Sequence, residues 1–360
     1  MAKSIIAAIV FFVAAAAAIS MYLHFHQPSS SRKSGNIDNP RTPPPERRKF
    51  DATVSATRPG AFKTVMEALQ AAPVHATTKY VIHIEAGTYN ELVVVWENRT
   101  NIWLVGDGAE VTKITMARSY PTFSTHETAT FSVQGEGFVA KDIAFENSAG
   151  PGSQAVALLS EASTSAFFRC IFLGYQDTLY SKLGRQFYRE CDIYGNIDFI
   201  FGEESLAIFQ NCNIFARLPK LVYFTAQGRS LLQSSSGFVF QNSSFTVASD
   251  MQLRKEEFVA YLGLPWFEYS TVVIMECYID DIISPLGWGE WPPKPTDKLT
   301  YIEYKNRGPG ANVNGRVNWT GYHALDRPDE VEMYTVQQFI KGDVWLPQTE
   351  IPYYTGLTSL

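Results

Sequence analysis

The sequence contains few of the residues that bind metals or form disulfides. Of its 360 residues only 4 are cysteine and 6 are histidine, no C-x-x-C pair occurs, and the histidines are scattered along the chain. Four cysteines do not make a disulfide scaffold in a chain of this length, and structural zinc sites need clustered Cys or His ligands. We therefore expect no metal site.

Positive charge is also scarce over most of the chain. Charged residues make up 18% of the sequence, and the net charge is −6. Because residues 1–50 carry a net charge of +5, the other 310 residues carry −11. Nucleic-acid-binding domains present a basic face, which an acidic domain of this kind does not offer. We expect no nucleic-acid partner.

One long apolar run is present, and it lies at the N-terminus. Residues 4–23 carry no charge, and Ala16, Ala17 and Ala18 are small residues of the kind that a signal peptidase requires. The run is also long enough to span a bilayer. Residues 1–26 are therefore predicted to be either a secretory signal peptide or a signal anchor, and we expect membrane contact only in the second case.

The composition changes after this run. Residues 27–50 are rich in Pro, Ser, Arg and Lys, which predicts a basic linker before a single folded domain at 51–360. Asn98, Asn242 and Asn318 each begin an N-x-S/T triplet. Such triplets accept N-linked glycans in secreted proteins, so they are consistent with an exported glycoprotein.

A repeat in the middle of the chain predicts the fold. Segments 167–172, 188–194 and 209–215 share aromatic and β-branched residues around Cys170, Cys191 and Cys212, and the cysteines are 21 residues apart. A fixed period of this size indicates stacked coils of strands. We predict an all-β, right-handed parallel β-helix. The cysteines are then either a buried ladder of small side chains or partners in a disulfide.

Other segments complete this solenoid. Residues 62–72 have apolar positions at helical spacing and end before Pro73, which predicts a short helix that covers the N-terminal end of the solenoid. Strands are predicted at 80–84, 92–95 and 102–105. Residues 285–295 are rich in Trp, Pro and Gly and predict an irregular arm, and the tail from Trp345 is expected to be extended.

The 21-residue period also brings two carboxylates together. Asp177 lies seven residues after Cys170, and Asp198 lies seven residues after Cys191. If the coils stack in register, the two aspartates are one strand spacing apart, about 5 Å. Two carboxyl groups that close do not both ionise freely, which suits acid/base and nucleophilic catalysis. On spacing alone, two aspartates that merely close turns are an equally good interpretation.

Several blocks in this order resemble the plant pectin methylesterase (pectinesterase) family over about residues 62–357. The blocks are Gly87–Glu91, Gln154–Leu158, Gly174–Tyr180, Asp198–Gly202, Thr225–Arg229 and Trp345–Pro347 followed by Gly356 and Leu357. The resemblance implies a parallel β-helix that removes methyl groups from galacturonate esters of pectin without a metal or organic cofactor. With about 50 residues before the catalytic part, it also implies a short form without the inhibitor-like pro-region.

The resemblance assigns roles to individual residues. Asp198 is the expected nucleophile, Asp177 the general acid and then base, and Gln154 and Gln176 the donors to the oxyanion. Four residues are expected to bind substrate, namely Thr125, Gln154, Phe201 and Trp266. Plain packing is the alternative interpretation of the two aromatic residues.

The chain departs from the family in one important position. Leu264 stands where the family has an arginine that holds the nucleophilic aspartate ionised, and an adjacent guanidinium lowers a carboxyl pKa by roughly 1–3 units. Lys182 and the pair Glu203 and Glu204 are lesser departures. Two functions stay open: a working esterase, or a catalytically impaired relative that binds pectin or a partner.

The resemblance also suggests partners and a location. Methyl-esterified homogalacturonan is the expected substrate, and a proteinaceous pectinesterase inhibitor is a second expected partner. Members of the family act outside the cell, so we expect secretion to the cell wall.

Overall fold

The computed structural model describes residues 50–290 and 295–358. The predicted signal or anchor at 1–26 and nearly all of the linker lie outside the described residues. In the described part of the chain, no helix is long and apolar enough to cross a membrane.

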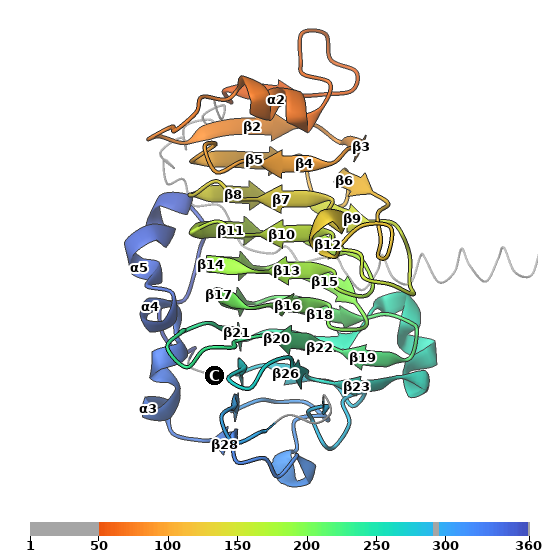
Figure 1. The fold of residues 1–360 in the computed structure, drawn as a ribbon, viewed down its shortest axis with the longest axis vertical. Coiled ribbons are helices and arrows are strands. Elements are labelled where there is room, and N and C mark those ends of the chain that lie inside the picture. Colours follow the sequence, from red (N-terminus) through yellow and green to blue (C-terminus); the bar gives the residue numbers. More distant parts are fainter. Residues whose placement is uncertain (1–49, 291–294, 359–360) are drawn as a thin grey trace, which may run out of the picture. The chain divides into compact units, whose positions relative to one another are not determined.

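Strands dominate the described domain, and they form three parallel sheets along one solenoid (Figure 1). Sheet A contains β1 (Ala52–Val54), β2 (Tyr80–Ile84), β5 (Ile102–Gly106), β8 (Phe138–Lys141), β11 (Thr164–Phe168), β14 (Leu183–Arg189), β17 (Glu204–Gln210), β21 (Gly237–Gln241), β25 (Thr271–Met275), β27 (Thr300–Tyr304) and β28 (Tyr322–Leu325). Sheet B contains β3 (Gly87–Asn90), β6 (Thr112–Met116), β9 (Ala144–Asn147), β12 (Ile171–Leu173), β15 (Asp192–Gly195), β18 (Asn213–Ala216), β22 (Ser244–Val247) and β26 (Tyr278–Ile279). Sheet C contains β4 (Val93–Val95), β7 (Phe131–Val133), β10 (Leu158–Ser160), β13 (Leu179–Ser181), β16 (Ile200–Gly202), β20 (Thr225–Gln227) and β24 (Leu264–Pro265).

Each coil in the middle of the solenoid contributes one strand to each sheet, and there the 21-residue step fixes the register. Phe167 lies opposite Tyr188, and Leu158 lies opposite Leu179, each pair 21 residues apart. A short parallel pair, β19 (Leu221–Tyr223) and β23 (Val259–Tyr261), lies outside the three sheets. This arrangement confirms the predicted parallel β-helix.

The interior of the solenoid is filled by ladders of like side chains. The rings of Phe167, Tyr188, Phe209 and Phe240 stack in succession with centroids 4.5–4.9 Å apart. Cys170, Cys191, Cys212 and Cys277 are buried and free. The cysteines therefore form the buried ladder, and the disulfide alternative is wrong.

The predicted N-terminal helix is present but shorter than expected. It is α2 (Val65–Ala71), and it buries Val65, Ala68 and Leu69 at the end of the solenoid (Figure 1). Thr64 caps it: its side chain accepts from the Glu67 N–H, and the Glu67 carboxylate accepts from the Thr64 N–H. This capping box explains why the helix starts after residue 64.

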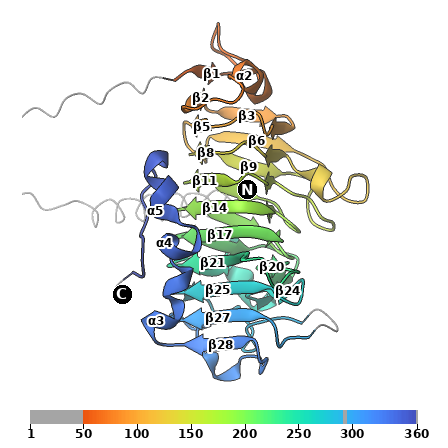
Figure 2. The ribbon, with the colours of Figure 1, turned by 60° about the vertical axis from the view of Figure 1, so that its left-hand side comes forward.

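The C-terminal segment covers the outer face of sheet A. It contains α3 (Pro328–Val331), η4 (Glu332–Tyr334), α4 (Val336–Phe339), α5 (Gly342–Trp345) and η5 (Leu346–Thr349), where η denotes a 3₁₀ helix. Its apolar residues pack on Phe187, Ile208 and Val239 (Figure 2). The remaining 3₁₀ helices are η1 (His126–Thr128), η2 (Ser249–Glu257) and η3 (Val313–Gly315). The predicted extended tail is therefore wrong as far as Thr349, and no helix or strand follows among the described residues.

Candidate active site

The register of sheet C aligns the two aspartates. Leu179 of β13 lies opposite Ile200 of β16, so Asp177 and Asp198, each two residues earlier, hold equivalent positions in consecutive coils. The Asp177 N–H donates to the carbonyl of Ile197 at 3.1 Å. Both aspartates have left-handed backbones, with φ of 62° and 51°. Asp tolerates this conformation better than most residues do, so the turns before β13 and β16 suit aspartate.

A pocket of about 260 Å³ opens at these turns. It brings together every residue that the sequence singled out for the site, together with three that it did not. The lining residues are Thr125, His126, Gln154, Gln176, Asp177, Tyr180, Asp198, Phe201, Ala226, Leu264 and Trp266. Residues from six separate segments of the chain thus meet in one cavity.

Both carboxyl groups have raised pKa values. Asp177 is only 8% exposed, and burial together with the charge of Asp198 raises its pKa well above the usual value. Burial raises the pKa of Asp198 to about 7. Asp198 Oδ1 is inaccessible and has no hydrogen-bond partner in the described part of the chain. The pair can therefore hold one proton and one charge near neutral pH.

The two glutamines lie on neighbouring coils. The Ala155 N–H donates to the carbonyl of Gln176 at 3.1 Å, which links the segments that carry Gln154 and Gln176. Gln154 precedes a strand, since β10 begins at Leu158. Neither side-chain amide nitrogen has an acceptor among the described residues, so both amides are available to a ligand.

Thr125 reaches the pocket from a loop. It immediately precedes η1, and its carbonyl accepts from the hydroxyl of Thr128 at 2.6 Å. The Thr128 hydroxyl in turn accepts from the N–H of Val156 at 3.0 Å, which ties this loop to the segment that follows Gln154.

Aromatic rings form the apolar side of the pocket. Phe201 stacks on Tyr180 with ring centroids 4.2 Å apart, and Trp266 lies 6.2 Å from Phe201 at 54°. Phe201 is 5% exposed and packs in an outer cluster with Leu159. Trp266 keeps more exposed surface and stacks on Phe267, so it is the more accessible of the two predicted platforms.

The pocket contains no strong cation among its described lining residues. Leu264 is 3% exposed, lies opposite Ala226 in the sheet and packs against apolar neighbours. Lys182 does not compensate, because its ammonium pairs with Glu161 Oε1 at 2.6 Å. Neither of the two nearby glutamates lines the pocket: Glu203 accepts from the hydroxyl of the lining residue Tyr180, and Glu204 accepts from the Ser234 hydroxyl.

His126, Tyr180 and Ala226 were missed from the sequence. His126 follows the predicted Thr125, and its Nε2 lies 3.1 Å from Glu161 Oε2. Tyr180 lies opposite Phe201 in sheet C, so the same register that paired the aspartates could have found it. Ala226 is opposite both Phe201 and Leu264 and could have been found in the same way.

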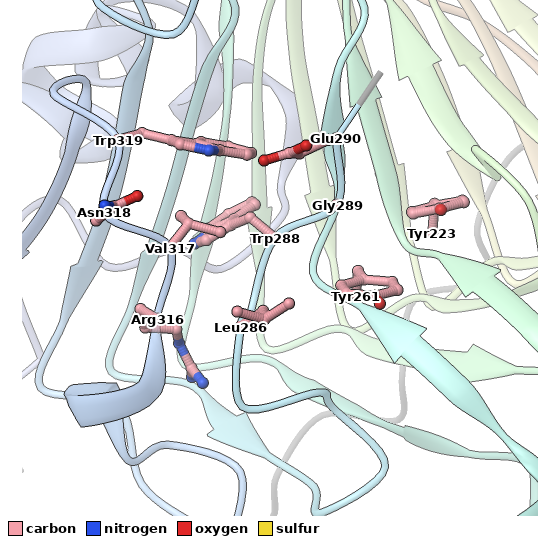
Figure 3. Close-up of a pocket in the computed structure, with 10 residues that line it drawn as sticks. All are labelled: Tyr223, Tyr261, Leu286, Trp288, Gly289, Glu290, Arg316, Val317, Asn318 and Trp319. Atoms are coloured by element: carbon pink, nitrogen blue, oxygen red, sulfur yellow. The ribbon is translucent and has the colours of Figure 1, made fainter. Parts of the chain in front are cut away.

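A second pocket, of about 440 Å³, lies where the predicted irregular arm crosses the β19–β23 pair (Figure 3). Leu286, Trp288 and Glu290 of the arm lie between Tyr261 and Trp319. Glu290 is the only carboxylic acid among the described lining residues, so this pocket lacks the paired acids of the first. We therefore take the first pocket as the candidate active site.

A metal site requires a cluster of side chains that can bind the ion. Within 50–290 and 295–358, no group of three or more His, Cys, Asp or Glu side chains is positioned to hold a metal ion.

Comparison with known proteins identifies the family. The pectinesterase family model matches residues 51–343. A probable pectinesterase/pectinesterase inhibitor of Arabidopsis thaliana is 45% identical over 315 residues, which are 86% of this chain and 60% of that protein. Pectinesterase 2 of Citrus sinensis is 46% identical over 303 residues, which are 83% of this chain and 59% of that protein. The chain thus spans about 60% of the length of these curated relatives.

A solved structure has the same fold. The pectin methylesterase from carrot superposes with a TM-score of 0.84 at 41% identity, and the match covers 86% of this chain and 99% of that one. The chain belongs to the pectinesterase family of carboxylic ester hydrolases.

Proposed function

We propose that this protein hydrolyses galacturonate methyl esters in pectin and releases methanol. The observation that carries the proposal is the pair of stacked aspartates, both with raised pKa values, in a pocket between two free amide donors and an aromatic wall. The similarity to a carrot pectin methylesterase supports the same substrate class.

In the first half-reaction the Asp198 carboxylate attacks the ester carbonyl carbon. The carbonyl oxygen becomes an oxyanion, which accepts hydrogen bonds from the amides of Gln154 and Gln176. When the tetrahedral intermediate collapses, the bond to the methoxy oxygen breaks, and Asp177 transfers its proton to that oxygen. Methanol leaves, and the sugar remains attached to Asp198 as an acid anhydride.

In the second half-reaction Asp177, now ionised, removes a proton from water. The resulting hydroxide attacks the anhydride carbonyl of the sugar, and the bond to Asp198 breaks. The products are a galacturonic acid, which then loses its proton to solvent, and the original Asp198 carboxylate, with the proton from water now on Asp177. The raised pKa of Asp177 suits this double role, because the group must hold a proton at the start and recover it at the end.

Phe201 and Trp266 are proposed to hold sugar rings, and Thr125 is proposed to contact the substrate from the loop side. We further propose secretion to the cell wall, by way of the signal or anchor at 1–26. A proteinaceous inhibitor is a proposed partner, because a relative carries pectinesterase inhibitor in its name.

A second function is favoured by one observation. Asp198 Oδ1 is buried without a partner, and Leu264 lies where the family has an arginine. A nucleophile that is hard to ionise is consistent with an impaired relative that binds pectin without hydrolysing it.

Methanol release from highly methyl-esterified pectin separates the two functions. Asp198→Asn is the matched blank, because Asn also tolerates the left-handed backbone and cannot act as the nucleophile. Release above this blank supports the esterase. No release from folded protein that still binds the polymer supports the impaired relative.

A further inference from the structure

The 21-residue register that aligns the aspartates also aligns three charged residues beside the pocket. Glu161, Lys182 and Glu203 directly follow β10, β13 and β16, so they hold equivalent positions in consecutive coils. Backbone bonds keep this register beyond the strands, since the Lys182 N–H donates to the Ser160 carbonyl at 3.0 Å and the Glu204 N–H donates to the Lys182 carbonyl at 2.8 Å. We call Glu161, Lys182 and Glu203 the charged row.

The charged row is acidic in sum, and its one cation is engaged. Lys182 Nζ lies 2.6 Å from Glu161 Oε1, and the other oxygen of Glu161 is 3.1 Å from His126 Nε2. Both groups that could attract an anion, Lys182 and the pocket-lining His126, are therefore paired with the same carboxylate. Glu203 has no cationic partner of its own among the described residues and adds an unbalanced negative charge.

Glu203 borders the catalytic pocket at two places. Its Oε1 accepts from the hydroxyl of Tyr180 at 2.8 Å, and Tyr180 lines the pocket. The aliphatic part of the Glu203 side chain also lies near Trp266. Both side chains pack over Gly228, because a Cβ added to that glycine would be 3.3 Å from Glu203 Cγ and 2.7 Å from Trp266 Cε3. The Glu203 carboxylate is thus separated from the pocket only by the side chain of Tyr180.

Glu203 is half-buried, which strengthens the electric field of its carboxylate. Its Oε2 is inaccessible and unpartnered. Burial raises the pKa of Glu203, whereas the hydrogen bond from Tyr180 and the charge of Lys182 oppose this rise. A carboxylate screened from water acts on a neighbouring charge more strongly than an exposed one does.

We propose that Glu203 makes the site selective for methyl-esterified neighbours. In this proposal, which rests on the proposed function, the sugar next to the reacting ester must itself be esterified, because a free galacturonate carboxylate there is repelled by the charged row and by Asp198. No cation in the described lining of the pocket offsets this repulsion. The preferred substrate is therefore a fully esterified stretch of homogalacturonan, and a de-esterified stretch is avoided.

The size of the effect follows from Coulomb's law. Two unit charges about 8 Å apart at an effective dielectric constant of about 30 change an equilibrium by roughly tenfold. We therefore expect kcat/KM for a fully methyl-esterified oligogalacturonide to exceed that for a matched oligomer with one free carboxylate beside the scissile ester by roughly tenfold.

The test compares Glu203→Gln with Glu204→Gln on these two oligomers. Gln at 203 can still accept from the Tyr180 hydroxyl and lacks the charge. Glu204 is the next residue, its carboxylate accepts from the Ser234 hydroxyl at 2.5 Å, and it is not among the residues that line the pocket. Glu203→Gln should lower the kcat/KM ratio toward one, leaving only the part that Asp198 contributes, and Glu204→Gln should leave the ratio unchanged. An unselective wild type, or an equal change in both variants, overturns the proposal.

The same oligomers separate this proposal from the proposed function. Their affinities are measured by calorimetry for Asp198→Asn, with and without Glu203→Gln. One outcome is that the wild type releases no methanol while the variants still bind the esterified oligomer more tightly in a way that depends on Glu203. That result retains the selectivity and refutes the esterase. If the wild type releases methanol, but neither the kcat/KM ratio nor the ratio of affinities for the two oligomers depends on Glu203, the esterase is retained and the selectivity is refuted.

Discussion

Replacing Leu264 with arginine should shift the acidic limb of the pH–rate profile. Leu264 lines the same pocket as Asp198, whose pKa is about 7. A guanidinium within a few ångströms lowers a carboxyl pKa by about 1–3 units. The nucleophile must be ionised, so wild-type activity should rise with pH as Asp198 loses its proton. Leu264→Arg should bring that rise to lower pH.

The expected increase in kcat depends on pH, and this dependence shows whether a lowered Asp198 pKa is its cause. With a shift of about 2 units, the ionised fraction of Asp198 at about pH 6 increases from roughly one tenth to roughly nine tenths, so kcat should increase about tenfold. At about pH 8 the carboxylate is ionised in both proteins, so the change should be less than about twofold.

Methanol release measured across this pH range tests the prediction. Leu264→Met is the matched control, because it changes the shape of the side chain without adding charge, and thermal unfolding confirms that each variant folds. An equal gain at both pH values, or no gain at about pH 6, would refute the account of how Asp198 is ionised. Arginine is larger than leucine at a site that is 3% exposed, so a loss of thermal stability without any shift of the profile would point to overpacking.

Three further predictions concern the amides, the nucleophile and the core. Gln154→Ala and Gln176→Ala should each lower kcat by about 10²–10³-fold with little change in KM, and an effect confined to KM would contradict an oxyanion role. The folded protein binds the Asp198 proton more tightly than the unfolded chain does, so wild-type stability is lost as pH rises from about 4 toward 7. Asp198→Asn should thus raise the free energy of unfolding above that of the wild type by a margin that grows over this range to a few kcal/mol, and a constant margin in calorimetry would contradict it. Phe209 is fully buried between two stacked rings, so Phe209→Ala should lower the free energy of unfolding in urea by about 3–5 kcal/mol and Phe209→Leu by less.

The repeat explains why part of the site could be predicted from the sequence alone. A 21-residue step fixes which residues face each other, so the alignment of Asp177 with Asp198 followed directly from the spacing of the cysteines. The same step relates Glu161, Lys182 and Glu203. The charged row was nonetheless missed, because Glu161 precedes the first of the repeated segments that reveal the period.

The rest of the site could not be derived from periodicity. Thr125 and Trp266 come from segments outside the regular coils, one before η1 and one after β24, and irregular backbone carries no period. Only the family resemblance indicated them. The end of the chain was misjudged for a related reason, since its short helices are held by packing on sheet A and not by strong helical periodicity.

Leu264 adds no positive charge to the pocket, and Glu203 adds a negative charge beside it. Without a guanidinium beside it, Asp198 keeps the pKa of about 7 that burial gives it, which slows the proposed attack on the ester at acidic pH. Leu264 and Glu203 also act after the reaction, because hydrolysis converts a neutral ester into an anion within the pocket. That anion forms close to Asp198 and the charged row, and no lysine or arginine is among the described lining residues. The product should therefore be repelled as it forms. An enzyme built in this way loses rate in the acylation step and gains it in product release, and it should leave each newly de-esterified position instead of continuing beside it.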